Sequence, residues 1–176
     1  MQIIDLTLPL YTGMPVFPGN PEVSIELVST FETNGWNMRR IQMNGHDGTH
    51  VNAPIHGTKD GKNLDDYSLE QFQGPARIYN PSVPISPDEG IIFRDQDIDQ
   101  RLAEQIKATR PLFVGLSSNF EVDIDIEKDF LREDIILFEK LANLDQLPDQ
   151  FHFYGMPLKI KGGDGSPVRA FAVVSE

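Results

Sequence analysis

The run Leu112-Phe113-Val114-Gly115-Leu116 is short, apolar throughout and preceded by Pro111. Uninterrupted runs of this kind are typical of strands that are buried on both faces of a sheet. Residues 97–109 come just before it and carry apolar side chains at helical spacing, with Asp97 in the position of an N-terminal cap. The apolar positions of this expected helix are Ile98, Leu102, Ala103 and Ile106. A helix beside a buried strand predicts an α/β fold rather than an all-β sandwich.

Other strands are expected along the whole chain. A second buried strand is predicted at 135–138, and runs that alternate apolar and polar residues predict strands at 3–8, 23–28, 38–43 and 76–80. Residues 156–160 and 170–174 flank Gly162-Gly163-Asp164-Gly165, which we interpret as a hairpin turn rather than a phosphate-binding loop. The 176 residues contain no repeat or linker, so we expect a single domain spanning 1–176.

Composition excludes several classes of protein. With no cysteine, the chain cannot form disulfides, thiolate nucleophiles or Cys-ligated metal centres. A formal net charge of -12 argues against nucleic acid as a partner, because binding a phosphate backbone requires clustered Lys and Arg. The first residues lack a basic segment leading into an apolar one, and no apolar run approaches the roughly 18 residues of a membrane span. We therefore expect a cytoplasmic protein whose partner is a small molecule.

Three of the four histidines fall within residues 46–56. This segment is not helical, because Gly48 and Pro54 oppose a helix. In an extended chain, side chains at even spacing share one face. The residues with that spacing are His46, His50, Asn52 and His56. Imidazoles that converge beside an oxygen ligand favour a divalent metal site, and the alternative is a set of hydrogen-bonding surface histidines.

The same segment resembles the signature of the cyclase family, which includes kynurenine formamidase and isatin hydrolase: His-x-Gly-Thr-His-x-Asp-x-Pro-x-His, here with Asn52 in place of the aspartate. Flanking matches at 5–7, 13–21, 157–160 and 165–170 extend the resemblance over most of the chain. It implies a cyclase-like swivelling β/β/α fold, with a central mixed sheet or barrel-like core flanked by helices. It also implies a homodimer or larger homo-oligomer and the metal-dependent hydrolysis of a small amide, formamide (as in arylformamidases), lactam or lactone.

Roles for individual residues follow from the resemblance. It implies that His46, His50 and residue 52 hold one metal ion, that residue 52 bridges to a second ion, and that His56 is the general acid/base. Glu127 and Glu139 match the later ligands of the second ion, where the family has a His and a Glu. Asn52 and Glu127 thus both depart from the pattern at the second ion, and a neutral amide oxygen is a poor bridge between cations. We expect one divalent cation rather than two, Zn²⁺ or Mn²⁺, with Mn²⁺, Mg²⁺ or Ca²⁺ favoured if the all-oxygen set is used.

Some of these residues have alternative roles. Glu127 lies in the acidic run 121–129, which is also the pattern of a solvated face. Glu139 ends a buried strand, where a carboxylate needs a partner, so a salt bridge to Lys or Arg is its alternative. Phe17 and Trp36 are candidates for the apolar wall of a substrate pocket, or for the core.

Two other functions remain to be weighed. Ser117-Ser118 with His152 could form a nucleophile and base, but no Gly-x-Ser-x-Gly turn presents either serine, and His152 reads as a hydrogen-bonded strand residue. A catalytically silent family member, acting as a small-molecule or metal-binding module or as a structural partner, is the main rival to the hydrolase. The changes at Asn52 and Glu127 motivate that rival.

Overall fold

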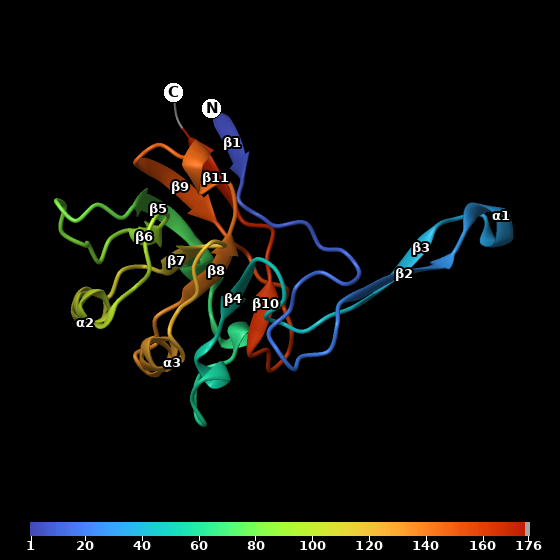
Figure 1. Cartoon of the computed structure of the whole chain (residues 1–176), viewed down its shortest axis with the longest axis horizontal. Helices are drawn as coiled ribbons and strands as arrows, with labels where there is room; N and C mark the ends of the chain where they lie inside the picture. The colour runs from blue at the N-terminus through green and yellow to red at the C-terminus, as the bar shows by residue number, and fades with distance from the viewer. Residues whose placement is uncertain (175–176) are drawn as a thin grey trace.

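The computed structural model describes residues 1–174, which form a nine-stranded sheet, two crossover helices and a separate two-stranded arm (Figure 1). The strand order of the large sheet is β1-β11-β9-β5-β6-β7-β8-β4-β10. Its strands are β1 (Gln2–Asp5), β4 (His50–Asn52), β5 (Gln73–Ile78), β6 (Gly90–Phe93), β7 (Val114–Ser117), β8 (Leu137–Leu141), β9 (Gln150–Tyr154), β10 (Gly165–Pro167) and β11 (Phe171–Val174). The four central strands β5 to β8 are parallel, and the outer pairs are antiparallel. This mixed sheet curls into a half-barrel, which confirms the predicted α/β class.

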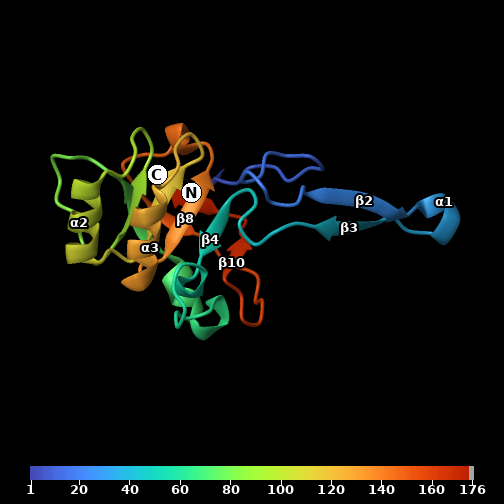
Figure 2. The ribbon, with the colours of Figure 1, turned by 60° about the horizontal axis from the view of Figure 1, so that its bottom comes forward.

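The two helices α2 (Gln100–Thr109) and α3 (Ile124–Arg132) connect parallel neighbours and lie side by side on one face of the sheet (Figure 2). Each helix turns an apolar stripe towards the sheet and its charged residues towards solvent. The stripes consist of Leu102, Ala103 and Ile106 in α2 and of Ile126, Phe130 and Leu131 in α3. They enclose a core with outward-facing side chains of β6, β7 and β8, which the parallel strands can supply because both of their faces are buried.

A second core fills the concave side of the sheet. At its centre the rings of Phe113, Phe138 and Phe153 pack with centroids 4.8 to 5.6 Å apart. Gly90 leaves the space for this packing, since a Cβ atom there would lie 2.0 Å from Phe113 Cε2. The aromatic cluster joins β8 and β9 to the residue just before β7, so β8, the strand that carries Glu139, has a rigid support.

The predicted helix and buried strands are present with shifted ends. The helix begins at Gln100 rather than Asp97, because the Asp99 carboxylate accepts a hydrogen bond of 2.8 Å from the backbone N–H of Leu102 and caps it. The predicted strands 112–116 and 135–138 correspond to β7 and β8, each of which begins two residues later than predicted. Residues 124–129 of the acidic run 121–129 belong to α3, and their charges conceal its buried apolar stripe in the sequence.

The predicted hairpin around Gly162–Gly165 is wrong. Residues 156–160 form no strand and make only an isolated bridge between Pro157 and Val168. Gly165 instead begins β10, which pairs with β4 in the register Gly165↔Asn52. The segment that was interpreted as a turn therefore lies beside the histidine motif.

The arm consists of β2 (Ser24–Ser29), the short helix α1 (Phe31–Asn34) and β3 (Met38–Gln42), and it projects away from the body (Figures 1 and 2). Within the described residues, its two strands pair only with each other. Its exposed large apolar side chains are Leu27, Val28, Phe31, Trp36, Met38 and Ile41. Within residues 1–174, no helix has the length and apolar character that a membrane crossing requires.

Candidate active site

The histidine motif enters the sheet through a turn, a short strand and a 3₁₀ turn. Gly48 adopts a left-handed φ of 70°, which favours glycine, and a Cβ atom there would also lie 2.8 Å from Leu10 Cδ2, so the Leu10 side chain would have to move. His50 and Asn52 then share β4, whereas His56 ends the 3₁₀ turn Pro54–His56. The prediction of one extended face is therefore wrong for His46 and His56, although their side chains still converge with His50 and Asn52.

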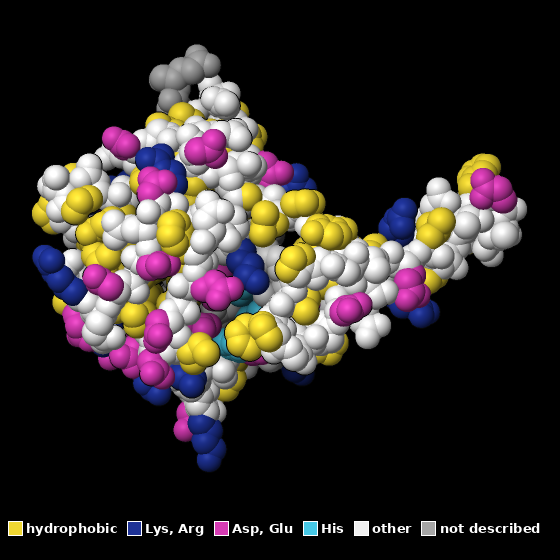
Figure 3. All heavy atoms as spheres, viewed as in Figure 1, with side chains coloured by type: hydrophobic (Ala, Val, Ile, Leu, Met, Phe, Trp, Pro, Cys, Tyr) yellow, Lys and Arg dark blue, Asp and Glu magenta, His cyan; other side chains and the backbone are white. Residues whose placement is uncertain are grey.

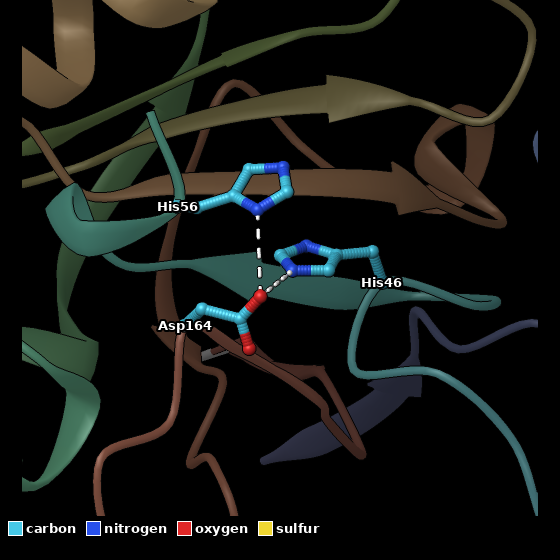
Figure 4. A group of neighbouring side chains, drawn as sticks. All are labelled: His46, His56 and Asp164. Carbon is cyan, nitrogen blue, oxygen red and sulfur yellow. Dashed lines mark hydrogen bonds and ion pairs between the residues drawn. The ribbon is translucent and has the colours of Figure 1, made fainter. Parts of the chain in front are cut away.

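His46, His56 and Asp164 meet at the open side of the site (Figure 4). One oxygen of Asp164, Oδ2, lies 3.1 Å from His46 Nε2 and 3.5 Å from His56 Nδ1, and the two rings stack with centroids 3.8 Å apart. Asp164 was not predicted as a site residue, because the glycines around it indicated a turn. In the structure a Cβ atom on Gly165 would lie 2.2 Å from His46 Cε1, so the glycine beside Asp164 lets the ring of His46 approach; the sequence alone does not show this contact.

Asn52 is fully buried and joins the remaining polar groups. Its Oδ1 lies 2.8 Å from His46 Nδ1, and its Nδ2 donates to Glu127 Oε1 at 2.9 Å and to Glu139 Oε1 at 2.6 Å. The predicted ligands 46, 52, 127 and 139 therefore come together, from four different segments. In this arrangement the amide oxygen of Asn52 faces His46, and its N–H groups hold the two carboxylates.

The alternatives for the two glutamates do not describe their surroundings. The Glu127 side chain is 18% exposed and turned into the site rather than to solvent. Among residues 1–174, Glu139 has no Lys or Arg partner for an ion pair; its neighbours are Asn52 and His50, whose Nε2 lies 3.7 Å from Glu139 Oε1. Both carboxylates thus accept a hydrogen bond from a neutral amide.

Burial decides the charge state of the inner site. Desolvation, with the nearby charges of His46 and Lys140, lowers the pKa of His50 to about 3. His50 is therefore neutral near pH 7, and its Nδ1, 2.8 Å from the carbonyl oxygen of Gly48, must carry the proton. That tautomer leaves the lone pair on Nε2, the atom facing Glu139, available to a ligand.

Burial makes the ionised forms of Glu127 and Glu139 unfavourable. Desolvation raises the pKa of Glu127 to about 7, and the charge of Glu139 adds to the effect. Desolvation also raises the pKa of Glu139, against the hydrogen bond from Asn52. Two buried carboxylates that resist ionisation are stabilised when a cation binds between or beside them.

His56 stands between this inner site and solvent. Its side chain is 36% exposed, and its Nε2 lies 3.9 Å from Glu127 Oε1. Desolvation and the charge of His46 lower the pKa of His56, while Asp164 acts in the opposite direction. His56 is consequently neutral near pH 7 and can accept a proton.

A cavity of about 390 Å³ opens above these residues. Figure 3 shows histidine atoms at the bottom of a hollow where the arm meets the body. Phe17 lines the cavity, as do Val122, Ile124 and Leu131. Trp36 does not line it: this side chain is 64% exposed and lies in the arm between α1 and β3, so its predicted place in the pocket of its own chain is not met.

The predicted weakness of a serine nucleophile agrees with the geometry. His152 pairs with Gln73, with His152 Nε2 2.6 Å from Gln73 Oε1. Ser117 is buried and accepts a hydrogen bond from the backbone N–H of Asn119. Neither Ser117 nor His152 lines the cavity above the histidines.

Comparison with known proteins identifies the family. The family model described as "Putative cyclase" matches residues 4–132. The chain belongs to the cyclase family. Kynurenine formamidase of Salinibacter ruber is 27% identical over 207 residues, covering 97% of this cyclase-family chain and 96% of that protein.

Solved structures agree with this assignment. An isatin hydrolase bound to the product analogue thioisatinate superposes with a TM-score of 0.82 at 20% identity, covering 99% of this chain and 93% of that one. A predicted metal-dependent hydrolase from Bacillus stearothermophilus superposes with a TM-score of 0.78 at 20% identity, covering 97% of each chain. These likenesses confirm the cyclase fold that the sequence resemblance implied.

Proposed function

We propose that this cyclase-family protein is a metal-dependent hydrolase of a small amide, formamide, lactam or lactone. The observation that carries the proposal is the clustering of three histidines with two desolvated carboxylates at the floor of an open cavity. Its relatives support the reaction class, since their names describe a formamidase, an isatin hydrolase and a metal-dependent hydrolase.

The donor groups fit a divalent cation. His46 and His50 supply imidazole nitrogens, and Glu127 and Glu139 supply carboxylates whose raised pKa values fall back when a cation binds. We assign one Zn²⁺ or Mn²⁺ to His46, His50, Asn52, Glu127 and Glu139, with Asn52 contributing only if its oxygen gives up the contact with His46. When bound, such an ion polarises the carbonyl of the substrate and lowers the pKa of a water molecule.

The side chains of the chain itself handle the proton. His56 is neutral and borders the cavity, so it accepts the proton of the attacking water as the water oxygen bonds to the carbonyl carbon. It then gives that proton to the leaving nitrogen, or oxygen in a lactone, as the bond from carbon to that atom breaks. The products are a carboxylate and an amine or alcohol. Asp164, beside both His46 and His56, holds the two rings in place.

Metal content is the first test. We expect about one transition metal ion per chain in protein purified without chelator, a rise in melting temperature on adding Zn²⁺ or Mn²⁺ but little with Mg²⁺ or Ca²⁺, and hydrolysis of formamides or lactams. His50→Ala should remove the metal and the activity, whereas His152→Ala, outside the cavity, serves as the matched control. Metal-free protein that no cation stabilises and that His50→Ala leaves unchanged would sink the proposal.

The catalytically silent alternative is favoured by the hydrogen bonds that already occupy Asn52. The double substitution Asn52→Asp with Glu127→His separates the two possibilities. A silent protein should gain metal affinity and some hydrolysis, whereas an adapted enzyme should lose the activity that it has.

We propose further that the protein acts as a homodimer or larger homo-oligomer in the cytoplasm. The arm supports the oligomer: β2 and β3 expose apolar side chains on a hairpin that has no core of its own, and an isolated two-stranded hairpin is marginal in water. Residues 24–42 are formally neutral, with Glu26 and Glu32 against Arg39 and Arg40, while the whole chain has a charge of -12. A second copy would therefore meet little net charge at the arm, and light scattering tests the mass.

A further inference from the structure

Strand β8 carries a bulge beside the site. Gly115 pairs with Phe138 and Ser117 pairs with Leu141, so Leu116 stands opposite both Glu139 and Lys140. Lys140 adopts a left-handed φ of 56°, which is costly for a residue other than glycine and rare within a strand. The strained residue is therefore held by its surroundings.

The bulge changes the direction of two successive side chains. In a regular strand, residues three apart point to opposite faces, yet Phe138 and Leu141 both enter the concave core. The two residues between them are turned out of that core, and both Glu139 and Lys140 line the cavity above the histidines. Without the bulge, alternation would place only one of them there.

A buried hydroxyl fixes the bulge to the histidine motif. Thr49 Oγ1 donates a hydrogen bond of 2.6 Å to the carbonyl oxygen of Lys140 and accepts one of 2.9 Å from the backbone N–H of Leu8. Thr49 is buried and directly precedes His50. The backbone of Lys140 is thus positioned by the same segment that positions the candidate ligands.

The ammonium group of Lys140 has no partner among residues 1–174. It makes no ion pair or side-chain hydrogen bond there, although Lys140 is half-buried and the chain has 27 acidic residues against 15 Lys and Arg. Its charge is felt by His50 and Glu139. Lys128 adds a second cation to the cavity lining from α3, at an exposed position, and Glu121 adds a carboxylate, also exposed. An unpaired, half-buried ammonium group beside the reacting groups is available to bind an anionic group of a ligand.

We propose that Lys140 binds a carboxylate of the substrate, so that the substrate class is an amide carrying an anionic group close to the scissile carbonyl. The inference rests on the hydrolase function proposed above and narrows it. Glu127 and Glu139 are the carboxylates that would hold the proposed cation, which leaves Lys140 to pair with the substrate. Lys128 strengthens the positive potential at the mouth, and Glu121 weakens it.

A matched pair of substrates tests the inference. N-formylanthranilate carries a carboxylate on its ring, ortho to the formamide group. Formanilide lacks this carboxylate and is otherwise identical. With metal-loaded protein, we expect kcat/KM for N-formylanthranilate to exceed that for formanilide by about tenfold or more, mainly through KM, because a charged hydrogen bond is gained. Lys140→Met should reduce this ratio about tenfold at an unchanged backbone cost, since methionine meets the same penalty at φ 56° as lysine.

Three further variants sharpen the result. Lys140→Arg should keep part of the preference, Lys128→Met should reduce it less than Lys140→Met, and Glu121→Gln should increase it. If Lys140→Met leaves the ratio unchanged while both substrates are hydrolysed, the substrate inference is overturned and the hydrolase stands. If neither substrate is hydrolysed, calorimetry with N-formylanthranilate still decides: binding that Lys140→Met weakens about tenfold supports the lysine, and equal or absent binding overturns it.

Discussion

At the scale of single residues, the site is organised by a neutral group. Asn52 gives its two N–H bonds to Glu127 and Glu139, and so holds together two carboxylates that would otherwise repel each other. Because the amide is neutral, it does not balance the charge of the carboxylates. Ionising the two glutamates therefore stays unfavourable in the folded protein. That cost makes the stability of the metal-free protein dependent on pH.

Glu127→Gln should expose this dependence. Folding raises the pKa of Glu127 from 4.5 to about 7, so between these values the folded state keeps a proton that the unfolded state has released, and stability falls as pH rises. A shift of that size corresponds to about 3 kcal/mol above pH 7. The measurement is urea unfolding in the presence of a chelator. The stability of the variant relative to wild type should rise by about this much from pH 5 to pH 8. A difference that is the same at both pH values would contradict the assignment.

Thr49→Val should loosen the bulge of β8. The substitution keeps the shape but removes the hydroxyl that bonds to Lys140 and Leu8, leaving a buried carbonyl and N–H without a partner. We expect a loss of about 1–3 kcal/mol in the free energy of unfolding, together with weaker discrimination between anionic and neutral amides. Thr49→Ser keeps the hydroxyl and is the control; if it behaves like the valine variant, the hydrogen bonds are not the cause.

At this scale the spacing of the sequence predicted the residues of a local motif, and the family resemblance added Glu127 and Glu139 from elsewhere in the chain. Asp164 and the bulge at Lys140 were not predicted. His46, His50, Asn52 and His56 lie within one short segment, so spacing alone indicated a common site. Asp164 reaches the same place through the pairing of β10 with β4, more than a hundred residues along the chain. The bulge at Lys140 likewise depends on Thr49, 91 residues away, and no local pattern records that contact.

At the scale of elements, the aromatic cluster supports β8, the strand that carries Glu139. Phe113, Phe138 and Phe153 are all fully buried, and Phe138 lies next to Glu139 on β8. Phe138→Ala should therefore cost about 3–5 kcal/mol in the free energy of unfolding. Phe171→Ala on β11 is the matched control, because Phe171 is only half-buried and stacks on Tyr154, and it should cost clearly less. Equal losses would mean that the cluster has no special weight.

Elements were predictable where the pattern was local and unambiguous. The stripe of α2 was visible because its charged residues are well separated from its apolar ones. Helix α3 has a similar apolar stripe, formed by Ile126, Phe130 and Leu131. Acidic residues that cap and solvate the helix lie between these positions, so the helical spacing of the apolar residues was not recognised in the sequence. The hairpin at 156–174 was wrong because β10 and β11 find their partners elsewhere in the sheet.

At the scale of the whole molecule, we propose that the arm carries the contact between copies of the chain. Leu27 and Ile41 lie on one face of the β2–β3 ribbon, because Ile25, which shares a face with Leu27, stands opposite Ile41. The double variant Leu27→Glu with Ile41→Glu should lower the mass measured by light scattering to that of a single chain. Glu26→Gln with Arg40→Gln alters the opposite face without changing net charge, and should leave the mass as it is. A wild-type protein that is already monomeric would remove the basis for this prediction.

The sequence contains one tryptophan, and it lies at the outer end of the arm. Because Trp36 is exposed in the folded chain, its ultraviolet emission should be that of an indole in water both before and after the body unfolds. Tryptophan fluorescence would therefore be nearly blind to denaturation of the sheet. It would instead shift to shorter wavelength whenever another surface covers the arm, which gives this protein a built-in optical probe of association at its most remote point.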